Sequence, residues 1–285
     1  MKHYIKLMRP HHYIKNILIF AALVCSGQLF DPEKLISGIL GFAAFCLVSS
    51  VVYIINDIRD VEKDRNHPTK CRRPIASGAV SPRNAGILAA ALLFGAIFCN
   101  LLVFQWMASL LLALYLALNL AYSFGLKNIP IVDITILVAG FLIRILYGAL
   151  VTDIVISNWL YLTVIALAFY FALGKRRNEL KQLKDGQTRK VLEAYPVDFL
   201  DKTMNMCLTL AIVFYSLWSM ADSTVAAYGQ QLVFTVPIVM LIVMKYSLNI
   251  EGESDGDPVE VLVHDKVLLL LCLVYFSAMF LILYL

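Results

Sequence analysis

The sequence predicts an all-α, polytopic membrane protein, a helical bundle of nine transmembrane helices in a single domain over residues 1–285. Hydrophobic residues make up 60% of the chain and charged residues only 15%, which is more apolar than a soluble domain. Runs of about 20 apolar residues, long enough to cross a bilayer as a helix, recur along the whole chain. Lysine and arginine gather in alternate loops, as in chains that cross a membrane repeatedly.

The first apolar run follows a sixteen-residue N-terminal segment that is polar in character and lacks a small-residue cleavage site, so we expect a retained span and not a secretory signal. This run is short and is interrupted by Gly27. The expected spans are 17–33, 35–56, 84–104, 107–124, 131–151, 158–174, 203–222, 232–248 and 266–285.

Basic residues fall on one side of the predicted bundle when the nine spans alternate. Four precede the first span, seven follow the second, Lys127 follows the fourth, and eight lie between Lys175 and Lys202. Only Lys34 falls on the opposite side. Since short loops rich in lysine and arginine stay cytoplasmic, we expect both large polar loops to face the cytoplasm from the inner (plasma) membrane.

Common soluble-enzyme motifs are missing from the sequence. The six cysteines form no CxxC pair and the five histidines no HExxH motif, which argues against a thiolate or histidine metal site. No P-loop, GxGxxG or Ser-His-Asp arrangement is present either.

A cluster of acids stands where the second apolar run stops. Asp57, Asp60 and Asp64 are three and four residues apart, so a helix leaving the span places them on one face, and Asn56 adds an amide oxygen. Mg²⁺ typically binds through one or two carboxylates together with phosphate oxygens. The spacing favours a Mg²⁺–diphosphate site with these three acids as metal ligands and catalytic residues. The alternative is an acidic helix end neutralised by the bases interspersed with it.

Basic side chains beside this cluster could cradle phosphate, because arginine pairs with phosphate oxygens and lysine supplies a point charge. A cytoplasmic basic loop is also ordinary, and the tyrosine-rich N-terminal segment could equally be an interfacial anchor. The candidate substrate-binding residues on these grounds are Arg9, Lys15, Asn16, Lys70, Arg72 and Arg73.

The motif NDxxDxxxD, intact from Asn56 to Asp64 at the exit of the second span, resembles that of the UbiA superfamily of intramembrane prenyltransferases. Nine spans are usual in that family, and the resemblance implies that the acids hold Mg²⁺ on the diphosphate of a donor. Prenyl-transferring members usually carry a second motif, DxxxD, after span six. Here residues 174–180 read Gly-Lys-Arg-Arg-Asn-Glu-Leu, with a single acid, Glu179.

Three segments are similar to one branch of the family, the decaprenyl-phosphate phosphoribosyltransferases: 9–16, 174–180, and 257–261 with Asp265. Asp265 could instead cap the last span. The resemblance implies transfer of 5-phosphoribose from 5-phosphoribosyl diphosphate to a polyprenyl phosphate, with Mg²⁺ as cofactor and diphosphate released. It implies a lipid bilayer and no nucleic acid as partner, and it leaves a homo-oligomer open.

Further candidates reach the same membrane face. Lys127, in the short loop after Tyr122, and the Lys175–Arg176 pair could hold the ribose 5-phosphate or the lipid phosphate. Glu179 could bind a ribose hydroxyl or pair with Lys175 one turn away.

Arg144 is a charge in the middle of a span, which usually faces an interior cavity. We expect it to bind substrate at depth in the bundle, with Asp133 as a partner only if the chain bends. The other interpretation is a buried pair that fixes helix packing.

Two other functions stay open. A UbiA-type aromatic prenyltransferase using a polyprenyl diphosphate would have paired acids after span six. A cation-binding membrane transporter would have broken spans or acids at the bilayer midplane, whereas the clear mid-span charge here is Arg144.

Overall fold

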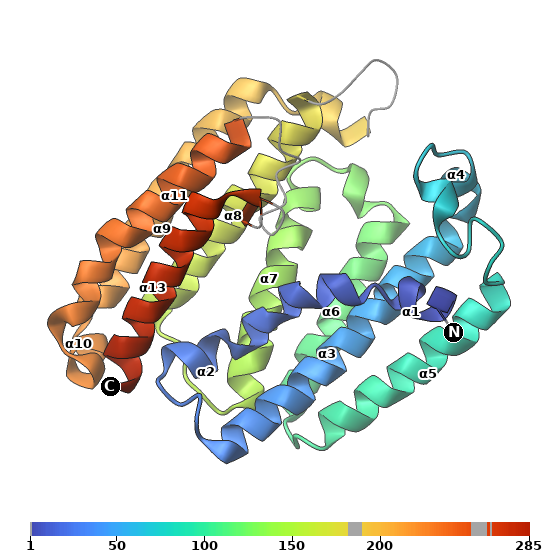
Figure 1. Cartoon of the computed structure of the whole chain (residues 1–285). Helices are drawn as coiled ribbons and strands as arrows, with labels where there is room; N and C mark the ends of the chain where they lie inside the picture. Colours follow the sequence, from blue (N-terminus) through green and yellow to red (C-terminus); the bar gives the residue numbers. More distant parts are fainter. Residues whose placement is uncertain (1, 182–189, 252–260, 263) are drawn as a thin grey trace. The chain divides into compact units, whose positions relative to one another are not determined.

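The computed structural model describes residues 2–181, 190–251, 261–262 and 264–285 and forms two compact units (Figure 1). Unit 1 comprises Met1–Gly125 and Ile143–Val155, and unit 2 comprises Leu126–Leu142 and Ile156–Leu285. All regular elements in the described ranges are helices, which confirms the all-α class. The single-domain expectation stays a prediction.

Unit 1 is organised around the long helix α3, along which α5 packs (Figure 1). Side chains that precede each helix explain where these two begin: Asp31 accepts hydrogen bonds from the backbone N–H groups of Glu33 and Lys34, and Ser81 accepts one from Asn84. The elements are α1 (Lys2–Met8), η1 (Pro10–Phe20), α2 (Ala21–Cys25), α3 (Pro32–Arg59), α4 (Val61–Arg65), η2 (Lys70–Arg72), α5 (Pro82–Leu101), α6 (Trp106–Phe124) and the second half of α7 (Val132–Val151).

The first expected span, 17–33, is not one α-helix. The chain enters it through Arg9 in a left-handed conformation (φ 55°), forms the 3₁₀ segment η1 and the short α2, and turns at Gly27 (φ 70°). A 3₁₀-helix rises about 2.0 Å per residue, so η1 and α2 together extend about 30 Å. This exceeds what an α-helix of equal length would reach.

Eight helices in the described ranges are long and apolar enough to cross a membrane. The count of nine is therefore approximate. The difference lies in η1 and α2, which start earlier than expected, at Pro10, and do not form one continuous α-helix of 18 residues or more.

Close packing of the η1 backbone against α7 fixes the position of η1 within unit 1. Gly148 of α7 faces the backbone of Ile19, and a Cβ added at this glycine would lie 1.9 Å from the Ile19 carbonyl oxygen. The missing side chain therefore lets η1 lie directly on α7.

Unit 2 contains a bundle in which α8 packs along α9, and α11 packs against α13 (Figure 1). Asp265 accepts a hydrogen bond from the backbone N–H of Leu268 at 2.7 Å, so it caps α13 as one interpretation of the sequence predicted. The elements are η3 (Leu126–Asn128), the first half of α7, α8 (Asn158–Lys181), η4 (Lys190–Ala194), α9 (Val197–Met220), α10 (Asp222–Tyr228), η5 (Gln230–Thr235), α11 (Val236–Glu251) and α13 (Lys266–Tyr284).

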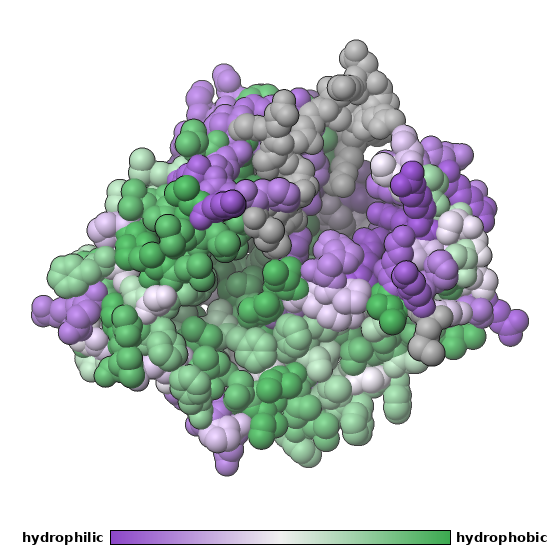
Figure 2. Space-filling view, in the orientation of Figure 1, coloured by the Kyte–Doolittle hydropathy of each residue, from purple (hydrophilic) through white to green (hydrophobic). Residues whose placement is uncertain are grey.

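The outer faces of both units are strongly apolar. In Figure 2, hydrophobic atoms cover much of the surface over α9, α11 and α13 in unit 2, while in unit 1 polar atoms gather around α4. Large side chains such as Phe94 and Phe276 are mostly exposed. Such surfaces are unfavourable in water and suit contact with lipid chains.

Candidate functional site

The acidic motif lies at the junction of α3 and α4 in unit 1. α3 ends at Arg59, and half-buried Asp60 breaks the helix, yet the backbone bonds Asp60 N to Asn56 O (2.9 Å) and Asp64 N to Asp60 O (2.8 Å) keep a helical course. Asp57 and Asp64 are consequently held in one cluster, and both are almost fully buried. The expected common face is realised for these two carboxylates.

Two arginines neutralise the buried carboxylates. Arg73 Nη1 donates to Asp64 Oδ2 at 2.6 Å and to Asp57 Oδ1 at 3.2 Å, so it bridges them. Arg9 Nη2 donates to the same Asp57 oxygen at 2.6 Å. Partners are needed here because an isolated buried carboxylate is strongly unfavourable. We call Arg9, Asp57, Asp64 and Arg73 the acid–arginine cluster.

The neutralising bases are not the interspersed ones considered from the sequence. Arg65 pairs instead with exposed Glu62 at 2.9 Å, and the Arg59 guanidinium lies 4.4 Å from the centre of the Phe124 ring. Arg9 reaches the acids from 48 residues upstream, because its left-handed backbone turns the chain between α1 and η1. Its guanidinium also lies over the Tyr53 ring, 5.1 Å from the ring centre.

The other expected phosphate ligands belong to the 3₁₀ segments η1 and η2 of unit 1. Lys70 and Arg72 belong to η2, directly before Arg73, and the Arg72 carbonyl accepts a hydrogen bond from Lys6. Lys15 is half-buried in η1. These residues stay candidates for substrate binding.

Asn16 and Arg144 form a buried network in unit 1. Arg144 Nε donates to Asn16 Oδ1 at 2.8 Å, and its Nη2 donates to the Tyr115 hydroxyl at 3.0 Å. The guanidinium also lies about 5 Å from the centres of the Phe45 and Tyr115 rings. These contacts match the interpretation of Arg144 as a residue that fixes helix packing.

The Arg144–Asp133 pairing considered from the sequence is not formed. Both residues lie on α7, a continuous helix, and eleven residues of α-helix place them about 16 Å apart. Without a bend in α7 the two side chains cannot meet.

Asp133 pairs with Arg176 within unit 2. Arg176 is fully buried; its Nε donates to Asp133 Oδ2 at 2.6 Å and its Nη1 to Glu179 Oε2 at 2.9 Å. Glu179 therefore bonds Arg176, and its expected partners, a ribose hydroxyl or Lys175, stay predictions. Lys175, Lys127 and Tyr122 are half-buried and stay candidates.

Tyr195 completes this network and was missed by the sequence reasoning. Its hydroxyl donates to Asp133 Oδ1 at 2.6 Å and accepts from the backbone N–H of Ile131. Burial and the hydrogen bond to Asp133 raise the pKa of Tyr195 to about 12, so the hydroxyl remains a donor near neutral pH. Its position just before Pro196 carries no sequence signal for this role.

Asp257, Pro258, Val259 and Glu260 lie outside the described residues.

The carboxylates of the acid–arginine cluster fit Mg²⁺ only when other ligands complete the coordination shell of the metal. Across the described part of the chain, no three acidic, histidine or cysteine side chains are grouped to hold a metal ion. Asp57 and Asp64 nevertheless present two carboxylates to one Arg73 nitrogen, and Mg²⁺ is commonly held by one or two carboxylates with phosphate and water completing its shell. The cluster suits a metal that arrives with a diphosphate, and not one caged by protein alone.

Comparisons with known proteins agree with the motif. A sequence model of the UbiA prenyltransferase family matches residues 17–260. The chain is 35% identical to the decaprenyl-phosphate phosphoribosyltransferase of Mycolicibacterium smegmatis, covering 95% of this chain and 89% of that protein. It is 34% identical to the enzyme of the same name from Corynebacterium glutamicum, covering 95% and 83%.

The fold is similar to that of a UbiA homologue from Archaeoglobus fulgidus solved with GPP and Mg²⁺. The TM-score is 0.73 over 99% of both chains, at 16% sequence identity.

Proposed function

This chain belongs to the UbiA prenyltransferase family and is a membrane transferase, and we propose that it moves 5-phosphoribose from 5-phosphoribosyl diphosphate to a polyprenyl phosphate. Diphosphate is the leaving group. The name and near-complete coverage of the mycobacterial and corynebacterial relatives support this choice within the family.

The acid–arginine cluster carries the proposal. Two buried carboxylates can hold Mg²⁺, and two guanidiniums beside them offer several N–H donors to phosphate oxygens. The carboxylates and the guanidiniums of the cluster pair with one another in this structure. We assign Asp57, Asp60 and Asp64 to Mg²⁺–diphosphate, with Asn56 supporting. Arg9 and Arg73, together with Lys15, Lys70 and Arg72, bind phosphate.

Mg²⁺, when bound, neutralises the charge that develops on the departing diphosphate. Arg9 and Arg73 assist by donating to its oxygens, and both are partly accessible, with side chains 18% and 25% exposed. The ribose C1 then acquires oxocarbenium character, as in glycosyl transfer generally. The attacking phosphate monoester has a second pKa of about 6 and is largely ionised near neutrality, so no strong general base is required.

The second network has a supporting role in this proposal. Asp133 and Tyr195 hold Arg176, and Arg176 in turn orients Glu179, whose side chain is 23% exposed and can accept a hydrogen bond from a ribose hydroxyl. Lys127 and Lys175 remain for the ribose 5-phosphate or the lipid phosphate. Arg144 and Asn16 act at depth by holding η1 in place.

The end of α8 argues against prenyl transfer to an aromatic ring. A single acid, Glu179, stands where that reaction would require an acidic pair, and the neighbouring Arg176 and Arg177 are buried in ion pairs. The surplus of lysine and arginine in the loops after spans two and six supports a site that faces the cytoplasm from the inner membrane.

The test uses purified full-length protein with Mg²⁺, labelled 5-phosphoribosyl diphosphate and a polyprenyl phosphate in mixed micelles. We expect a labelled lipid and released diphosphate. A parallel reaction with a polyprenyl diphosphate and an aromatic acid should give no product. Product in the second reaction alone would overturn the proposal in favour of prenyl transfer.

Variants test the roles of the acids. Asp57→Asn and Asp60→Asn should abolish turnover while the protein still elutes as a folded species, because each removes a charged oxygen ligand. Glu62→Gln, on the exposed side of α4, is the matched control and should keep its activity. Near-normal turnover in both aspartate variants would show that the metal assignment is wrong.

A further inference from the structure

Unit 2 contains an apolar pocket of about 310 Å³ between α8, α9, α11 and α13. It is lined mainly by apolar and aromatic side chains, including Leu167, Ala211, Val243 and Phe171. Protein interiors rarely leave voids larger than a water molecule, and this volume falls within the range of ligand pockets. The pocket is therefore large enough to bind a small apolar group.

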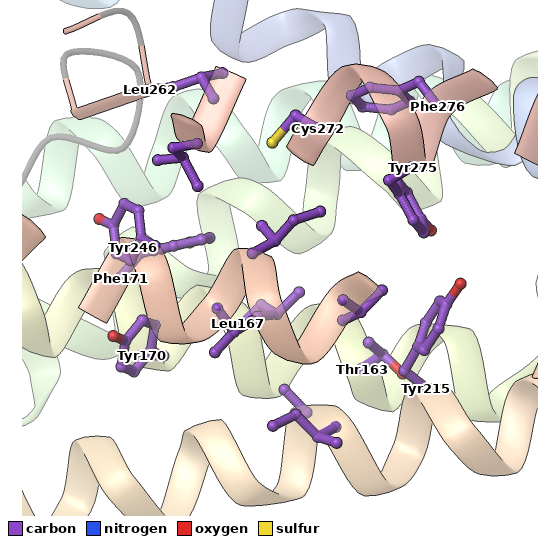
Figure 3. Close-up of a pocket in the computed structure, with 16 residues that line it drawn as sticks. Thr163, Leu167, Tyr170, Phe171, Tyr215, Tyr246, Leu262, Cys272, Tyr275 and Phe276 are labelled. Carbon is purple, nitrogen blue, oxygen red and sulfur yellow. The ribbon is translucent and has the colours of Figure 1, made fainter. Parts of the chain in front are cut away.

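The shape of the pocket follows the helix axes. Thr163 and Tyr170 of α8 both line it, and seven residues of helix separate them, which is about 10 Å. Figure 3 shows the Tyr170 and Tyr246 hydroxyls pointing toward one end and the Tyr215 and Tyr275 rings at the other. Phe276, which is mostly exposed, also lines the pocket and marks an opening at the lipid-facing surface.

A second, polar pocket of about 240 Å³ lies next to the tyrosine end. Tyr170 lines both pockets, and its hydroxyl is bonded to Ser247 of the polar one at 2.7 Å. The remaining lining is supplied by the ends of α8, α9 and α11 and includes Arg177, Asp201, Asn205 and Glu251.

One nitrogen of the Arg177 guanidinium, which lines this polar pocket, has no acceptor among the described residues. The residue is only 5% exposed; its Nε pairs with Asp201 and its Nη2 with Glu251, at 2.9 Å to Oε2. Its buried Nη1 has no hydrogen-bond partner among the described residues. A buried donor without an acceptor is unfavourable, so the site calls for a ligand oxygen.

The charges of the polar pocket select the kind of head group. Arg177 and neighbouring Lys181 balance Asp201 and Glu251, so the pocket is close to neutral before a ligand enters. A single phosphodiester charge can pair with Arg177 Nη1, whereas the nearly doubly charged phosphate monoester of a polyprenyl phosphate would add repulsion from the carboxylates. The acids, Asn205 and Ser247 can accept hydrogen bonds from head-group hydroxyls.

We propose that these two adjoining pockets form a binding site for one bilayer phospholipid with a glycerol head group. One acyl chain enters the apolar pocket past Phe276, the phosphodiester bonds Arg177, and the glycerol hydroxyls contact Asp201, Asn205 and Glu251. The lining residues of both pockets belong to unit 2, whereas the residues of the acid–arginine cluster belong to unit 1. The lipid site does not depend on the proposed reaction.

Native mass spectrometry of the full-length protein tests this site. The protein is released from bilayers that contain equal parts dioleoylphosphatidylglycerol, dioleoylphosphatidylcholine and polyprenyl phosphate. We expect one retained phosphatidylglycerol per chain, favoured about tenfold over phosphatidylcholine. Ala211→Phe, which fills the apolar pocket, should reduce retention about tenfold or more. Ala91→Phe, the same change at an exposed position of α5, should leave it unaltered.

A milder variant guards against a folding defect. Asn205→Ala at an exposed position should keep the protein intact and reduce the preference for the glycerol head group. The proposal is overturned if wild type retains no phosphatidylglycerol or retains phosphatidylcholine equally. It is also overturned if polyprenyl phosphate occupies the site, or if Ala211→Phe and Asn205→Ala both behave as wild type.

Discussion

Replacing Gly148 by alanine should displace η1 from α7. The added Cβ would lie 1.9 Å from the carbonyl oxygen of Ile19 and 2.7 Å from its carbonyl carbon, whereas real Cβ atoms essentially never approach closer than 3.0 Å. The two segments must therefore separate by about 1.1 Å, and the blocking atoms belong to backbone that cannot rotate away. Overpacking of this kind typically costs about 1–3 kcal/mol.

The displacement has a second effect on the buried polar network. If η1 moves by that amount, the Asn16 Oδ1 to Arg144 Nε distance of 2.8 Å grows beyond hydrogen-bonding range. Loss of a buried hydrogen bond to a charged group adds about 1.5–3 kcal/mol, so we expect a total destabilisation of about 2.5–6 kcal/mol.

Gly86→Ala is the matched control. Gly86 lies within α5, and an added Cβ would meet nothing within 4 Å. Because alanine is a better helix former than glycine, this change should leave stability unaltered or raise it by about 0.5–1 kcal/mol.

Thermal unfolding in one detergent, followed by intrinsic fluorescence, measures both variants against wild type. Gly148→Ala should unfold well below wild type and lose transferase activity, since η1 carries Lys15 and follows Arg9. Equal unfolding temperatures for the two alanine variants would refute the argument that Gly148 is required for the contact between η1 and α7.

Three further predictions concern charged and polar side chains. Arg73→Lys should lower kcat/KM at least about tenfold with little loss of stability. One Arg73 nitrogen makes both hydrogen bonds to Asp57 and Asp64, which an ammonium can replace, whereas an ammonium cannot offer phosphate oxygens the other donors of the guanidinium; unchanged kinetics would contradict the phosphate-binding role. Tyr195→Phe should destabilise the protein by about 1–3 kcal/mol near neutral pH. Since the pKa of Tyr195 rises from 10.0 to about 12 on folding, its protonation favours the folded state most below pH 10. The difference in free energy of unfolding between wild type and Tyr195→Phe should accordingly become smaller as the pH rises from 10 to about 12. A difference that does not change with pH would argue against a buried, protonated Tyr195 hydroxyl. Asp265 pairs with Lys245 and caps α13, and these hydrogen bonds lower its pKa to about 2. The ionised Asp265 carboxylate should stabilise the folded state above about pH 4, and this stabilisation should disappear as the pH falls toward 2. Asp265→Ala should lower the unfolding temperature at pH 7 more than Asp265→Asn, because asparagine keeps an acceptor for Leu268 N–H.

Apolar run length predicted most of the fold, because a helix that must satisfy its own backbone in lipid leaves a long continuous signal. The same criterion described 17–33 poorly. Neither the left-handed Arg9 nor the contact between Gly148 and Ile19 can be recognised from hydropathy, since one is a backbone conformation and the other joins residues far apart in sequence.

The spacing of the acids along the sequence predicted that they cluster, but it did not predict which basic residues pair with them. The spacing of Asp57 and Asp64 places both in one cluster, but the arginines that neutralise them come from 48 residues before Asp57 and 9 residues after Asp64. Asp133 shares a predicted span with Arg144 and could pair with it only if the chain bent, whereas its partner is Arg176, 43 residues away. Ion-pair choice depends on tertiary packing, which spacing along one chain does not encode.

The network around Arg144 has a consequence for how the chain is made. At a helix centre an arginine opposes insertion into the membrane by about 2.5–3.5 kcal/mol, and each Ile, Leu, Val or Phe favours it by about 0.3–0.6. α7 carries twelve such residues, so it can enter the bilayer unaided despite its charge. Asn16 and Tyr115 both precede Arg144 in the chain, and during synthesis they are therefore already available when the arginine arrives. The order of residues along the polypeptide thus shortens the time for which this charge stands alone in lipid.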